Sequence, residues 1–159
     1  MNIEYTPGPL LDASRMTPTA LWNDSADLDE LRQSIAFGGV GATCNPVIGY
    51  TTIRKHPDIW QDRIRAIAES NPTWGESQIG WQAIKDMSVE AAKLLEPIFV
   101  EHRGRNGRLS IQTDPRLHRD AKALTDQAEE FSNLAPNIIV KIPCTSVGID
   151  AIEEATYRG

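Results

Sequence analysis

Short apolar segments alternate along the chain with longer segments in which apolar residues recur at helical spacing. The plainest short segment, 137–143, reads NIIVKIP, and a helix is predicted directly after it at 146–154. Strands that alternate with helices form parallel sheets, because each helix returns the chain to the edge where the next strand begins. The alternation therefore predicts an α/β fold with a parallel sheet.

Four such strand–helix pairs can be counted. The predicted strands lie at 19–24, 40–43, 108–113 and 137–143. The predicted helices lie at 27–37, 57–70, 76–95, 119–134 and 146–154. Residues 1–18, which contain Pro7, Gly8 and Pro9, show no period and predict an irregular arm. We therefore expect one unit over 19–159, with a long helical segment at about 49–107.

Composition and motifs exclude several classes of function. There are 16 Lys+Arg against 22 Asp+Glu, and this net charge of −6 argues against a general nucleic-acid binder. No apolar run approaches the roughly 20 residues of a membrane span. The three histidines show no zinc-binding spacing, so no metal is expected. Cys44 and Cys144 lie far apart without a CxxC motif, which together with the lack of a secretory start predicts a cytoplasmic protein.

Lys141 is the most informative residue, because it interrupts a strand that otherwise consists of Ile and Val. A parallel strand covered on both faces is expected to be apolar throughout. Burial of an ammonium group is costly and favours the neutral amine, which is a nucleophile for carbonyl carbons. The alternative is a lysine at the rim of the sheet that extends to solvent or pairs with a carboxylate.

Polar residues also stand at the ends of the other predicted strands. Asp24 ends the first, Thr43 and Asn45 lie at the end of the second, and Gln112 lies near the end of the third. Active-site groups of α/β folds gather at this carboxyl edge. Asp24 is a candidate acid or base, and the neutral groups can orient a polyhydroxylated substrate or water. Alternatively these residues cap helices and satisfy loop backbone, a role for which Asp27 is better placed than Asp24.

Three segments resemble the transaldolase family. They are GATCNPVI at 41–48, with its Thr-x-Asn-Pro step after the second strand, IIVKIPCTSVGIDAI at 138–152 around the lysine, and NDSAD at 23–27. The resemblance covers about 19–159. It implies a (β/α)8 TIM barrel, of which this chain holds about the first four strand–helix units.

The resemblance also implies a class I aldol mechanism on sugar phosphates, with no cofactor. Lys141 forms the Schiff base with a ketose phosphate, and Asp24 is the general acid and base. Asn45 and Thr43 bind substrate hydroxyls. A dihydroxyacetone unit is then transferred to an aldose phosphate, as in the pentose phosphate pathway.

Two departures from the family pattern leave alternatives open. Gln112 stands where transaldolases have a glutamate that assists water, and the fructose-6-phosphate aldolase branch has glutamine there. The later strands, whose Ser and Arg residues hold the phosphate in the family, have no counterpart here. The chain is therefore expected to be a transaldolase-type enzyme, a non-catalytic half-barrel that needs complementation, or an aldolase. Open barrel edges also predict self-association or complementation.

Overall fold

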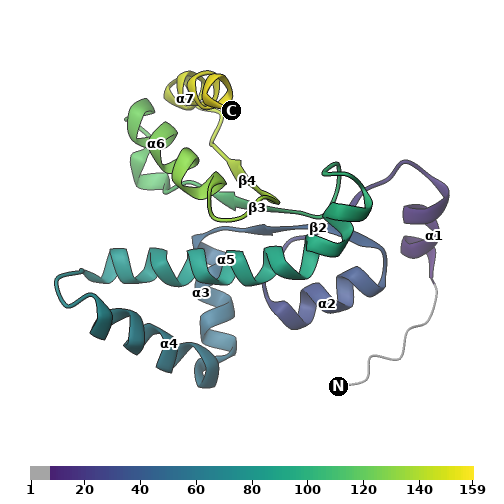
Figure 1. Ribbon diagram of the computed structural model, residues 1–159, viewed down its shortest axis with the longest axis horizontal. Helices are drawn as coiled ribbons and strands as arrows, with labels where there is room; N and C mark the ends of the chain where they lie inside the picture. Colours follow the sequence, from purple (N-terminus) through teal and green to yellow (C-terminus); the bar gives the residue numbers. More distant parts are fainter. Residues whose placement is uncertain (1–7) are drawn as a thin grey trace.

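The protein is described by a computed structural model over residues 8–159, and it contains one four-stranded parallel sheet with helices packed against it (Figure 1). The strands are β1 (Leu21–Asn23), β2 (Gly39–Cys44), β3 (Arg108–Gln112) and β4 (Ile138–Lys141). They lie in chain order, and each pairs in parallel with the next. The predicted α/β fold is confirmed, and the open sheet is that of a partial (β/α)8 barrel.

Every strand is followed by helix, as the alternation predicts. The helices that follow strands are α2 (Leu28–Ala36), α3 (Pro46–Lys55), α4 (Pro57–Ser70), α5 (Glu76–Glu101), α6 (Ala121–Ser132) and α7 (Ser146–Arg158), and a 3-10 turn, η1 (Pro115–Leu117), precedes α6. The long helix α5 runs beneath the sheet, whereas α6 and α7 gather beside β4 (Figure 1). None of the helices within residues 8–159 combines the length and apolar character needed to cross a bilayer.

Two sequence predictions about helices are wrong in part. Residues 9–16 of the expected irregular arm form α1 (Pro9–Met16), in which Pro9 suits the first turn and Leu11 is buried. Residues 1–7 of that arm lie outside the described residues. The helix predicted to end at 95 continues to Glu101 through Pro97, because Ile98 still packs against the core.

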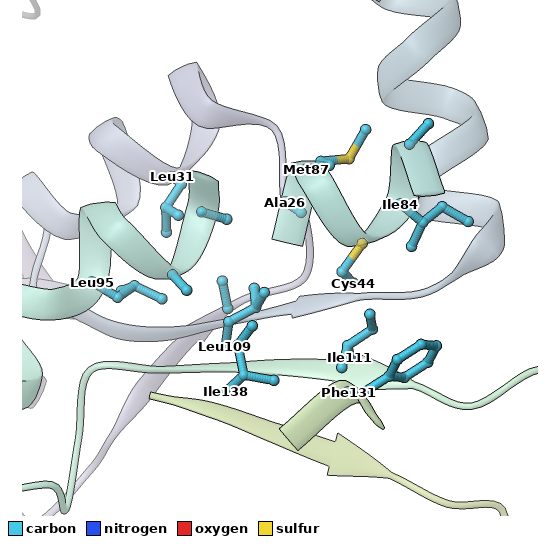
Figure 2. Close-up of a cluster of buried hydrophobic side chains, with 14 of the residues drawn as sticks. Ala26, Leu31, Cys44, Ile84, Met87, Leu95, Leu109, Ile111, Phe131 and Ile138 are labelled. Carbon is cyan, nitrogen blue, oxygen red and sulfur yellow. The ribbon is translucent and has the colours of Figure 1, made fainter. Parts of the chain in front are cut away.

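Alternate residues of the strands face the helices and form the core. Ala42, Cys44, Leu109 and Ile111 are at most 1% exposed. Figure 2 shows Cys44, Leu109 and Ile111 in one cluster with Met87 and Leu95 of α5 and Phe131 of α6. Burial raises the pKa of the Cys44 thiol to about 11, although a hydrogen bond with Ser88 opposes this, so Cys44 acts as a packing residue.

The intervening residues point to the opposite side, which we call the open face. Side chains alternate along a strand, so the open face carries Trp22, Gly41, Thr43, Ser110, Gln112, Ile139 and Lys141. Trp22 and Lys141 are exposed, and Thr43, Ser110 and Gln112 are half-buried. The open face is therefore polar and accessible, in contrast to the face that the helices cover.

Candidate functional site

The predicted site residues collect at one edge of the sheet. In parallel strands all carboxyl ends meet at the same edge. Asp24 directly follows β1, Thr43 is the penultimate residue of β2, and Gln112 and Lys141 are the last residues of β3 and β4. Gln112 and Lys141 are neighbours in the β3–β4 register. The sequence thus brings a carboxylate, a hydroxyl, an amide and an amine to a single edge.

Asp24 and Thr43 are in direct contact. The Thr43 hydroxyl donates a hydrogen bond to Asp24 Oδ1 at 2.6 Å. The carboxylate of Asp24 is otherwise exposed to solvent. Asp27, rather than Asp24, caps α2, because its side chain accepts hydrogen bonds from the backbone N–H groups of Asp29 and Glu30. The expectation that Asp27 is the capping residue is confirmed, and Asp24 remains accessible to a ligand.

Asn45 has a structural use that the sequence analysis offered as an alternative. Its Oδ1 accepts hydrogen bonds from the N–H groups of Val47 and Ile48, both at 2.9 Å, so Asn45 is the N-cap of α3. Pro46 is the first residue of that helix. An asparagine amide also has two donor hydrogens. The cap therefore fixes the side chain while its nitrogen can still donate to a substrate oxygen.

Lys141 is exposed, so the expectation of a buried ammonium group is wrong for this chain, and the alternative of a lysine at the rim that extends to solvent fits the structure. The expectation of burial assumed a strand covered on both faces. Instead β4 is the last strand of the sheet and pairs only with β3 among the described residues. The outer edge of β4 therefore leaves Lys141 open to water.

A groove runs along this outer edge of β4. It has a volume of about 830 Å³ and lies between β4, α6 and α7. Ile139, Ile152 and Lys141 contribute to its walls, together with Arg158. In a closed barrel a fifth strand occupies this place. A smaller hollow of about 220 Å³ lies at the other end of the site, against Asp24 and Asp27.

The sequence did not predict that Asp27 pairs with Lys55 and His56, an interaction that holds the turn after β1. Asp27 is 2% exposed, and its Oδ2 lies 2.7 Å from His56 Nε2 and 3.1 Å from Lys55 Nζ. Burial alone raises the pKa of Asp27, but hydrogen bonds from Glu30 N–H, His56 and Lys55 outweigh it and lower the pKa to about 2. This ionised carboxylate joins the turn to the start of α4.

The same group holds the ligand types that bind metals. Ligand atoms of Asp27, Asp29 and His56 all lie within 4.8 Å of one another. Both Asp27 oxygens already accept hydrogen bonds, from backbone N–H groups on one side and from His56 on the other. The geometry is thus accounted for by helix capping and ion pairing. Its signal in the sequence is weak, because Asp27 and His56 are 29 residues apart.

Comparison with known proteins agrees with this arrangement. Residues 21–159 match the family described as Transaldolase/Fructose-6-phosphate aldolase. A transaldolase of Thiobacillus denitrificans is 33% identical over 93% of this chain, and transaldolase 2 of Streptomyces avermitilis is 35% identical over 88%. The chain spans only 42% and 39% of the lengths of these two relatives. The chain belongs to the transaldolase/fructose-6-phosphate aldolase family, and its four parallel strands are consistent with part of a (β/α)8 barrel.

Proposed function

We propose that this chain supplies the Schiff-base half of a transaldolase-type site. The Lys141 amine adds to the ketone carbon of a ketose phosphate, and loss of water gives an iminium ion. Asp24 takes the proton of the hydroxyl on the carbon β to the iminium carbon, the bond between the α and β carbons breaks, and the β carbon leaves as the aldehyde of an aldose phosphate. The dihydroxyacetone enamine on Lys141 then adds to an acceptor aldose phosphate, and hydrolysis of the new iminium returns the free amine.

The observation that carries this proposal is that Lys141 lies at the same carboxyl edge of the parallel sheet as the hydrogen-bonded pair of Asp24 and Thr43. Neighbouring strands lie about 4.8 Å apart, so Asp24 and Lys141 are separated by roughly 14 Å along the sheet. A long lysine side chain and a bound sugar phosphate can span that interval. Thr43 donates to Asp24 and so orients the carboxylate that accepts the substrate proton.

Gln112 is proposed to hold water or a substrate hydroxyl. Its place beside Lys141 in the register supports this role. A glutamine amide donates and accepts hydrogen bonds but does not exchange protons as a carboxyl group does. This residue favours, as a second candidate, simple aldolase cleavage of fructose 6-phosphate. Release of more than one equivalent of glyceraldehyde 3-phosphate per chain without an acceptor indicates cleavage, whereas a transferase stops after one equivalent.

Complete turnover is proposed to need further strands. Among residues 8–159 no further strand pairs with β1 or β4 at the two edges of the sheet, and the chain spans about two fifths of its relatives' length. A second polypeptide that carries the remaining strands can close the barrel and supply a phosphate site, whereas a second copy of this chain can close the barrel only. Without such a partner the chain is a half-barrel that binds and activates the ketose but does not complete transfer. The proposed substrates, sugar phosphates, place it in cytoplasmic carbohydrate metabolism of the pentose phosphate type.

Borohydride trapping tests the Schiff base. The folded chain is incubated with dihydroxyacetone and sodium borohydride, and the intact mass is measured. Dihydroxyacetone has no phosphate, so the result does not depend on a phosphate site. We expect one reduced adduct in the wild type and its loss in Lys141→Arg, with Lys122→Arg as the matched control on exposed lysine. The proposal fails if Lys141→Arg labels as well as the wild type.

Complementation tests the need for a partner. The chain is co-expressed with the part of the Thiobacillus denitrificans transaldolase that lies beyond the matched region. We expect transaldolase activity from the mixture and none from either polypeptide alone. Transfer activity in this chain alone at a dimeric mass supports closure by a second copy instead. Activity that appears in the mixture and survives Lys141→Arg contradicts the assignment of Lys141.

A further inference from the structure

Trp22 lies flat against β2 on the open face of the sheet. It is the register partner of Gly41. A methyl group built on Gly41 comes within 2.5 Å of two ring atoms of Trp22 and within 2.8 Å of a third. Contacts this short mean that the indole occupies the space a side chain at position 41 needs. Gly41 therefore makes room for the ring, and the ring covers the backbone of β2 at that point.

The indole ring of Trp22 lies next to the hydrogen-bonded pair of Asp24 and Thr43, on the side away from the carboxyl edge of the sheet. Asp24 follows Trp22 by two residues, and Thr43 follows Gly41 by two, so all of them are on the same side of the sheet. Two residues along a strand span roughly 6–7 Å. The indole thus lies one layer beneath the hydrogen bond between Thr43 and Asp24.

Trp22 is 40% exposed, whereas the helix-facing residues Ala42, Leu109 and Ile111 are fully buried. The other half-buried or exposed side chains on the open face near it, Thr43 and Ser110, are polar. Aromatic rings with a few placed polar groups are the side-chain types that line small-molecule sites. The two hollows described above do not include Trp22, so the ring forms an open platform rather than the wall of a pocket. The C–H faces of a sugar are apolar and pack on such rings, while its hydroxyl groups reach the polar side chains.

We propose that Trp22 is the floor of the ketose site and positions the carbon skeleton of the sugar below Asp24 and Thr43. Gly41 is needed for this arrangement, because a side chain at position 41 would occupy the space of the Trp22 ring. The identity of the ligand rests on the proposed function, whereas the platform itself rests on the packing of Trp22 on Gly41. Trp22 is a positioning residue and takes no part in proton transfer.

The concentration dependence of trapping tests this proposal. Adduct formation at Lys141 is measured against fructose 6-phosphate concentration in the wild type, Trp22→Ala and Trp22→Phe. Loss of one aromatic contact predicts a half-saturating concentration about three- to tenfold higher in Trp22→Ala. The limiting trapping rate is expected to change less than about twofold, and Trp22→Phe is expected to restore binding. Trp74→Phe, a tryptophan between α4 and α5, is the matched control.

A purely structural role for Trp22 gives a different result. Trp22→Ala then lowers the midpoint of thermal unfolding and leaves the half-saturating concentration unchanged. That outcome overturns the proposal while the Schiff-base function stands. The two failures are distinguishable, because the wild-type adduct at Lys141 is measured in the same series.

If no adduct forms on any variant, tryptophan fluorescence still tests whether the sugar binds against Trp22. The proposed function then fails, but binding of fructose 6-phosphate can still be followed by fluorescence of the unreacted protein. A saturable change in emission that disappears in Trp22→Phe and persists in Trp74→Phe supports the floor. The absence of any change in the wild type, or a change that persists in Trp22→Phe, overturns it.

Discussion

The two faces of the sheet consist of the same strands but differ in the burial and the polarity of their side chains. On β3, Ile111 is fully buried beneath the helices, and its neighbour Gln112 is half-buried on the open face. On β2, Cys44 packs in the core, and Thr43 donates to Asp24. Stability therefore resides on one face and the proposed chemistry on the other, at a spacing of one residue. Substitutions at adjacent positions can separate the two.

The largest expected difference is between Ile111 and Gln112. Ile111→Ala removes a fully buried side chain and is expected to cost about 2–5 kcal/mol of unfolding free energy. Gln112→Ala, one residue further, is expected to change it by less than about 0.5 kcal/mol. Urea unfolding of both variants measures the two values. Equal costs would mean that the open face is also packed, and the contrast between the faces would be lost.

Gly41 is the place where the open face is tightly packed. Gly41→Ala brings a methyl group into the Trp22 ring and is expected to cost about 1–3 kcal/mol. In a Trp22→Ala background the same change is expected to cost less than about 0.5 kcal/mol, since the ring is gone. Thermal unfolding of the four proteins completes this cycle. Costs that simply add would show that the methyl group meets something other than Trp22.

The ion pair at Asp27 gives a pH dependence with a defined sign. Its pKa is lowered from 3.8 to about 2 in the folded chain, so the stabilisation is present above about pH 4 and is lost as the pH falls toward 2. Asp27→Asn is expected to cost about 1–2 kcal/mol near pH 7 and little near pH 2. Urea unfolding of both proteins at several pH values measures the difference. A difference that is constant with pH contradicts the ionised carboxylate.

Asn45 combines a structural role with a proposed functional one, because it caps α3 and follows β2 at the edge that carries the candidate site. Asn45→Ala removes the cap and is expected to cost about 1 kcal/mol. Asn45→Asp retains an oxygen that accepts the two N–H groups, so stability is expected to stay within about 0.5 kcal/mol of wild type. The aspartate cannot donate to a substrate hydroxyl, and weaker trapping of fructose 6-phosphate is expected. Unchanged trapping in Asn45→Asp would limit Asn45 to the cap.

Local signals were sufficient for much of the fold. The strand–helix alternation and the cap at Asp27 each depend on residues close in sequence, and the structure has both. The helix over 9–16 was missed because eight residues with one buried leucine give too little periodicity. The site edge was also predictable, because strand ends in a parallel sheet share an edge.

Features that depend on distant partners could not be predicted in the same way. The exposure of Lys141 depends on whether another strand lies beside β4, which the composition of β4 does not specify. The pairing of Asp27 with His56 depends on where α3 brings the chain 29 residues later. The packing of Trp22 on Gly41 depends on the register of β1 with β2.

The most direct measurement is the location of the reduced adduct among the five lysines of the chain. After treatment with dihydroxyacetone and borohydride, peptide mapping gives the share of label at Lys55, Lys85, Lys93, Lys122 and Lys141. The Lys122 side chain is 80% exposed, so the label at Lys122 measures non-specific reaction. We expect the label to concentrate on Lys141. Label spread evenly over the exposed lysines would contradict a Schiff-base site on the open face.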